Sequence, residues 1–143
     1  MGPLNDYDFV SRTREILAQY ETLNLPTDKN YDVTLFINAC VGLLFVAKET
    51  GTLPMGTIQQ YGLVSAQIPK NNKGTSESEL EAVCRHIRNS IAHKRFKTSG
   101  NPIDTLYFED RNKRCQTFCM AVSLTEFKTF VMNISKFFLD GKI

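Results

Sequence analysis

The segment from Val33 to Val46 restricts the fold more than any other part of the chain, because nearly all of its residues are apolar. It predicts a helix over about Tyr31–Glu49 that leaves almost no polar face, started by Asp28 or Asn30. Such a helix is buried on several sides or at a subunit interface. Its longest uninterrupted apolar run, residues 39–47, is far too short to span a bilayer.

Three further segments have the apolar spacing of amphipathic helices, and serine or acidic residues suited to capping stand at their beginnings. They cover about Asp6–Leu23, Ser78–Ala92 and Ser123–Leu139. Residues 50–75 are rich in Gly, Pro and Asn and predict a long loop with one helical turn around Ile58–Tyr61.

A β-hairpin is expected before the last helix. The runs IDTLYFED and RCQTFCMAV are rich in aromatic or β-branched residues, and a polar turn at Asp110–Lys113 separates them. An isolated hairpin is marginally stable, so it must pack on the helices or pair with another segment. The 143 residues are expected to form one all-α domain, a helical bundle with a small hairpin before the last helix.

Charge and cysteine content limit the possible functions. The net charge of +2 permits a nucleic-acid partner without arguing for one. Cys40 and Cys84 fall in apolar helical patterns, and Cys115 and Cys119 have no second ligand pair nearby, so neither a metal nor another cofactor is expected. The N-terminus lacks the pattern of a signal peptide, which favours free thiols in the cytoplasm and no membrane association.

The helix over residues 78–92 carries the candidate chemistry. With roughly 100° per residue and His86 at zero, the apolar residues of this helix fall between about 60° and 160°. Asn89 falls near 300°, His93 near 340° and Arg88 near 200°. These polar side chains are expected to point away from the core, towards solvent, the 50–75 loop or a second subunit.

The residue types suit cleavage of a phosphodiester without a metal. A histidine can take the proton of a ribose 2′-hydroxyl or protonate the leaving oxygen. An arginine can hold a phosphate through two hydrogen bonds and stabilise developing charge. Asn89, one turn before His93, could orient the imidazole or the substrate. Arg88 and His93 lie about 140° apart on an ideal helix, so either the helix loosens before His93 or two copies form the site around a two-fold axis.

The stretch Arg88-Asn89-Ser90-Ile91-Ala92-His93 resembles the motif of the HEPN (higher eukaryotes and prokaryotes nucleotide-binding) family: an arginine, a polar residue, a few variable residues and a histidine, late in a bundle helix. The resemblance implies a homodimer in which both motifs build one cleft. It implies a metal-independent endoribonuclease of a toxin or defence type that leaves a 2′,3′-cyclic phosphate and a 5′-hydroxyl. Arg88, Asn89 and His93 would be its catalytic residues. The hairpin departs from the plainest HEPN bundle and suggests a plasmid or phage-defence lineage.

Two alternatives to the enzyme remain open. One is a non-catalytic HEPN module that binds RNA, a nucleotide or a protein. The other is a HEPN component neutralised by a partner such as a nucleotidyltransferase antitoxin.

The residues around the motif also allow plainer interpretations. The basic residues Lys94, Arg95 and Lys97 are candidates for binding the RNA backbone, although such a run is most often a solvated helix end. His86 is expected to be a hydrogen-bonded surface or interface residue. Phe96 is expected to pack into the core, and Tyr107, Phe108 and Phe118 to pack within the hairpin.

Overall fold

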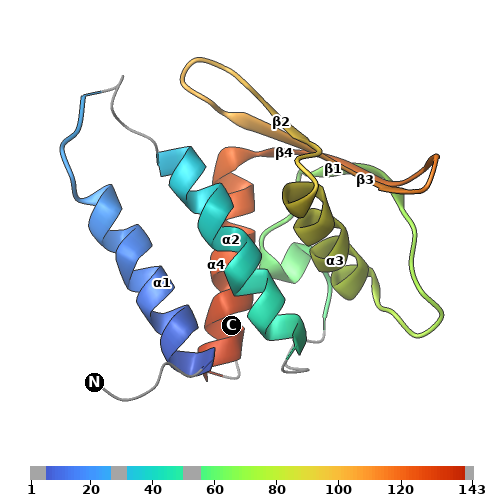
Figure 1. Cartoon of the computed structure of the whole chain (residues 1–143), viewed down its shortest axis with the longest axis horizontal. Helices are drawn as coiled ribbons and strands as arrows, with labels where there is room; N and C mark the ends of the chain where they lie inside the picture. Colours follow the sequence, from blue (N-terminus) through green and yellow to red (C-terminus); the bar gives the residue numbers. More distant parts are fainter. Residues whose placement is uncertain (1–5, 27–31, 50–55, 141–143) are drawn as a thin grey trace.

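The computed structural model describes residues 6–26, 32–49 and 56–140, with the α-helices on one side of an antiparallel sheet (Figure 1). The α-helices are α1 (Asp6–Glu21), α2 (Asp32–Glu49), α3 (Glu79–Ala92) and α4 (Leu124–Asp140). The strands are β1 (Gln67–Asn71), β2 (Phe96–Ser99), β3 (Thr105–Asn112) and β4 (Cys115–Ser123), and a 3₁₀ turn, η2 (Gln59–Tyr61), precedes them. The four predicted helices and the turn before Tyr61 are confirmed, whereas the suggested caps at Asp28 and Asn30 lie outside the described residues.

The predicted all-α fold is wrong, because the sheet has four strands in the order β1-β4-β3-β2. The fold is mixed α/β. The expected hairpin is its centre, formed by β3 and β4, and β1 and β2 pair antiparallel with its two free edges. The hairpin is therefore stabilised both by packing on helices and by further strands.

The two edge strands carry little sequence signal. β1 has the sequence QIPKN and β2 the sequence FKTS, so both are short and mostly polar. Pro69 within β1 argues against a strand in a sheet centre, but an edge strand tolerates a missing N–H donor. A pattern search for apolar alternation cannot distinguish such segments from loops.

Helix α2 is the centre of the helical layer and contacts α1, α3 and α4. This explains its lack of a polar face and confirms that it is buried on several sides. Its buried residues include Phe36, Cys40 and Leu43. The ring of Phe36 meets that of Phe127 on α4 edge-to-face, with centroids 5.9 Å apart.

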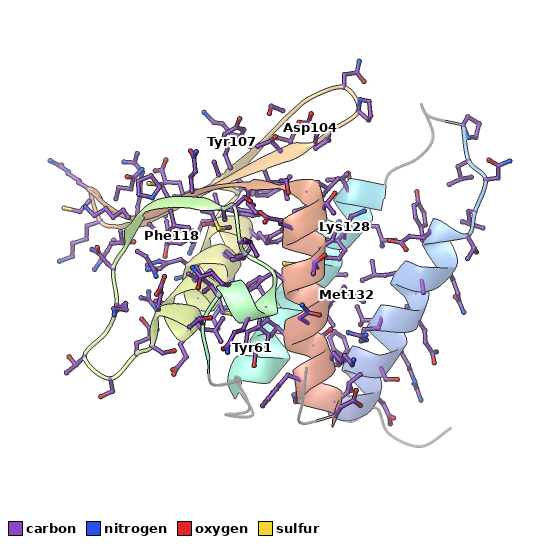
Figure 2. The ribbon with its side chains drawn as sticks, turned by 180° about the vertical axis from the view of Figure 1, so that it is seen from behind. Tyr61, Asp104, Tyr107, Phe118, Lys128 and Met132 are labelled. Carbon is purple, nitrogen blue, oxygen red and sulfur yellow. The ribbon has the colours of Figure 1, made fainter. Side chains whose placement is uncertain are left out.

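The sheet buries one face and leaves the other open. Alternate residues of β3 and β4 point into the core, among them Leu106, Phe108 and Phe118, and each is at most 2% exposed. Burying side chains of this size contributes roughly 1.5–3 kcal/mol each. Tyr107 lies on the opposite face, where it is paired with Ala121 of β4 and is 43% exposed (Figure 2). Phe96 packs against the core as predicted.

The hairpin turn lies further along the chain than the sequence predicts. Asp110 belongs to β3 and is only 4% exposed, while the turn falls at Lys113 and Arg114. Leu106, Phe108 and Asp110 therefore form one inward-facing row that ends in a carboxylate.

Candidate functional site

Hydrogen bonds fix helix α3 at both ends. The Ser78 hydroxyl accepts from the N–H of Glu81 at 3.1 Å and caps its beginning. At its end, the N–H of Arg95 donates to the Ser90 carbonyl at 2.7 Å and the N–H of Lys94 to the Ile91 carbonyl at 3.1 Å. This is a Schellman motif, in which the residue at the position of Lys94 takes a left-handed conformation and is usually glycine. Lys94 has a φ of 56°.

His86 is fully buried, so the prediction of a surface or interface position is wrong. Its Nδ1 lies 2.8 Å from Oδ2 of Asp110, and its Nε2 lies 2.7 Å from the carbonyl oxygen of Asn72. Its ring stacks on Phe118 with centroids 4.8 Å apart. The helical wheel assumed a single buried face, but α3 lies between α2 and the sheet and is buried on two sides.

Asp110 is the centre of a buried polar cluster. Its carboxylate accepts from His86, from Nδ2 of Asn89 at 3.2 Å and from the backbone N–H of Arg111 at 2.9 Å. Burial alone raises the pKa of Asp110, but these hydrogen bonds outweigh burial, so the net shift is downward. The carboxylate therefore remains ionised and holds α3 against β3.

Asn89 connects this cluster to the end of the motif. Its side chain is held by Asp110, while its backbone carbonyl accepts from the N–H of His93 at 2.9 Å. His93 is the C-cap of α3, just beyond the last helical residue Ala92. The side chain of Asn89 is thus held by the buried cluster, one helical turn before His93.

The three predicted catalytic side chains lie in three different environments. His93 is exposed, and Asn89 is half-buried against the sheet. Arg88 is half-buried near Cys84: burial raises the pKa of that thiol to about 12, and the positive charge of Arg88 opposes the rise. α3 ends at Ala92, but the N–H of His93 still makes the helical hydrogen bond to the Asn89 carbonyl, so helical spacing continues to separate His93 from Arg88 by about 140°.

The predicted RNA-binding residues Lys94, Arg95 and Lys97 are all exposed. Nη1 of Arg95 lies 3.9 Å from Oδ1 of Asp110, a long and partly solvated ion pair that contributes little to stability. All three residues border a groove of about 490 Å³ on the open face of the sheet. Tyr107 and Arg111 are also part of its wall.

A second, more polar depression of about 530 Å³ lies on the other side of Arg111. His86, Asn89 and Asp110 form part of its wall, together with Lys73 and Arg85. Arg85 is held by Glu77 through two hydrogen bonds of 2.8 and 2.9 Å. Arg111 thus stands between the groove and the buried cluster.

Neither a metal centre nor a membrane span is found within the described ranges. No group of three His, Cys, Asp or Glu residues there could hold a metal ion. Cys115 and Cys119 are four positions apart on one extended strand, which separates their Cα atoms by about 13 Å. No helix in the same residues is long and apolar enough to cross a bilayer.

The sequence interpretation missed two residues of this region, Asp110 and Tyr107. The signal for Asp110 was the alternation of Leu106 and Phe108, which, continued by two residues, places Asp110 inside. The same alternation places Tyr107 on the outer face. Because turn-forming residues cluster after position 109, Asp110 was assigned to the turn, and the alternation that places Asp110 inside and Tyr107 outside was not followed.

A family model described as HEPN pEK499 p136 matches residues 1–143, the whole length of the chain. No curated protein and no solved structure matches the chain.

Proposed function

This chain belongs to the HEPN pEK499 p136 family, and on that premise we propose that it is a metal-independent endoribonuclease. Arg88 and His93 are its catalytic residues in this proposal, and Asn89 positions the end of the helix between them. The observation that carries the proposal is the anchoring of His93. Its imidazole is exposed, while its backbone is tied through Asn89 to the buried carboxylate of Asp110.

The chemistry requires one proton to leave the 2′-hydroxyl and another to reach the leaving oxygen. The 2′-oxygen attacks the adjacent phosphorus, the bond to the 5′-oxygen breaks, and the products are a 2′,3′-cyclic phosphate and a 5′-hydroxyl. In this proposal the exposed imidazole of His93 serves one of these two proton transfers. The guanidinium of Arg88 stabilises the negative charge that develops on the phosphate oxygens.

We further propose that the working site is built from two copies of the chain. Arg88 and His93 of one copy leave the helix in different directions, and a two-fold axis near the end of α3 would bring each next to its counterpart. HEPN relatives commonly form homodimers, which supports this arrangement. A partner protein such as a nucleotidyltransferase antitoxin would act by covering the same surface.

The test is cleavage of a mixed RNA pool by the purified chain in the presence of chelator. His93→Ala and Arg88→Ala should each lower the rate by about 10²–10⁴-fold, the usual effect of losing one acid–base or charge-stabilising group. Lys136→Ala, an exposed change on α4, is the matched control for loss of a positive charge. A wild-type chain that cuts no RNA, or a His93→Ala variant as fast as wild type, would overturn the proposal.

The second candidate is a HEPN module that binds RNA without cutting it. The basic groove on the open face of the sheet favours this function, because a binding module needs the groove and not the imidazole. Binding of RNA by wild type and by His93→Ala with equal affinity, and no cleavage by either, would support it.

A further inference from the structure

The open face of the sheet combines an aromatic ring with an excess of positive charge. The groove of about 490 Å³ runs over β1, β4, β3 and β2, and Figure 2 shows Tyr107 on this side of the sheet. The volume falls within the range of small-ligand sites. In the described part of the chain, no helix packs over this face.

Tyr107 is placed to stack on a planar ligand. Lys97 on β2 and Ala121 on β4 are its direct neighbours across the sheet. The small side chain of Ala121 leaves room beside the ring, and the phenol oxygen lies 3.3 Å from the Ser99 hydroxyl, which holds the ring in place. An aromatic ring fixed in this way loses little conformational freedom when a nucleobase stacks on it.

The charges around the ring favour an anion. Four basic residues line the groove, Lys94, Arg95, Lys97 and Arg111, and Glu109 is the acidic residue of its wall. The Glu109 carboxylate is bonded to Arg111, so these two charges largely cancel, and Lys94, Arg95 and Lys97 supply the positive excess. Cations spaced around an aromatic platform fit a chain of phosphates with unpaired bases between them.

We propose that this groove binds a single-stranded segment of RNA, with one base stacked on Tyr107 and the flanking phosphates on Lys97 and Arg95. The proposal rests on the proposed function, which makes RNA the ligand, and it adds that the strand is unpaired. In a duplex the base faces are stacked on one another and cannot reach an aromatic ring. Because Lys94 and Arg95 directly follow His93 in the chain, a strand leaving the groove past them approaches the exposed imidazole.

The test measures binding of a fluorescein-labelled single-stranded RNA to the full-length chain by fluorescence anisotropy. All variants carry His93→Ala in addition, so that cleavage does not consume the probe. Tyr107→Ala should weaken binding about tenfold, in line with the loss of one base–aromatic stack. Tyr107→Phe should keep most of the affinity, because it retains the ring and loses only the hydrogen bond to Ser99.

Charge and duplex controls sharpen the test. Lys97→Ala should weaken binding and reduce the dependence of affinity on salt by about one ion. Val64→Ala, an exposed apolar change outside the groove, should leave binding unchanged. A duplex of the same sequence should bind more weakly than the single strand. Circular dichroism melts of each variant check folding.

Three results would overturn the inference. They are equal affinity of Tyr107→Ala and its parent, duplex binding as tight as single-strand binding, and competition by a poly-glutamate peptide that is as strong as competition by RNA. Failure of the proposed function gives a different result. If wild type cuts no RNA but Tyr107→Ala still weakens RNA binding, the binding groove is supported and the nuclease function is refuted. If His93 is required for cleavage, but Tyr107→Ala binds normally in the His93→Ala background and cuts normally with His93 present, only the groove is wrong.

Discussion

Nδ1 of His86 on α3 lies 2.8 Å from Oδ2 of Asp110 on β3, and the two side chains are 1% and 5% exposed. The pair joins α3, which carries Arg88 and Asn89, to the central hairpin of the sheet. Each residue has further hydrogen bonds, His86 to the Asn72 carbonyl and Asp110 to Asn89. Removing either side chain therefore leaves several buried polar atoms without a hydrogen-bond partner.

His86→Ala and Asp110→Ala are each expected to lower the free energy of unfolding by about 3 kcal/mol, because breaking a buried hydrogen-bonded pair leaves its partner unsatisfied. Urea unfolding followed by circular dichroism measures the change. His93→Ala, which removes an exposed imidazole from the same helix, should change stability by less than about 0.5 kcal/mol. Equal stability of the His86→Ala and His93→Ala variants would contradict this account of the cluster.

Lys94→Gly is expected to raise the free energy of unfolding by about 1 kcal/mol. A non-glycine residue in the left-handed region is strained, and glycine at this position of a Schellman motif removes the strain. Lys94→Ala provides the comparison, since it removes the charge and keeps the Cβ. Stability should rise with glycine only, whereas both variants should bind RNA more weakly. A destabilised Lys94→Gly variant would mean that the lysine side chain itself stabilises the end of α3.

Glu77 is expected to make stability depend on pH in the acidic range. The hydrogen bond from Arg85, opposed by burial, lowers the pKa of Glu77 to about 2 from a usual value of 4.5. A depressed pKa stabilises the folded state above pH 4.5, and this contribution disappears as the pH falls towards 2.

Thermal melts of wild type and Glu77→Gln at several pH values measure this contribution. Wild type should be more stable at pH 7 by on the order of 1 kcal/mol after allowance for solvent screening, and the difference should shrink between pH 4.5 and 2. Ser76→Ala, a nearby exposed change, should follow the wild-type curve. A difference independent of pH would rule out the ion pair as its source.

Activity should reappear when two inactive variants are mixed. If Arg88 of one copy works with His93 of the other, a dimer of His93→Ala with Arg88→Ala contains one complete pair of residues. Co-expressed variants with different tags, purified in tandem, should recover part of the wild-type cleavage rate, and sedimentation should find a dimer. No recovery in a confirmed mixed dimer would argue for a site within one chain.

Long periodic segments were predictable from sequence, and short edge segments were not. The apolar spacing of α1, α3 and α4 and the near absence of polar residues in α2 correctly indicated four helices. Strand pairing of β1 and β2 depends on partners far away in sequence, and their own residues mark neither a buried face nor a boundary. The error in fold class follows from these two strands.

The family was predictable from residue identity, whereas the surroundings of the candidate residues were not. The resemblance of the segment from Arg88 to His93 indicated the HEPN family, and the family model confirms that family. The burial of His86 could not be predicted, because a helical wheel has no information about a second layer. Because the sequence predicted only two of the four strands, the side of α3 that packs on the sheet was assigned to solvent or an interface.

The two edge strands, β1 and β2, also influence the order in which the strand pairings form during folding. β1 and β2 are joined in sequence through α3, yet they pair with opposite edges of the β3–β4 hairpin. Both pairings of β4 must wait until this strand is synthesised, but its pairing with β3 closes a short loop, whereas its pairing with β1 closes a far larger one. A nascent chain that has not yet completed β4 lacks the strand that joins β1 to β3, and it lacks Phe118, on which His86 stacks. The full anchoring of α3 therefore waits until β4 has been synthesised.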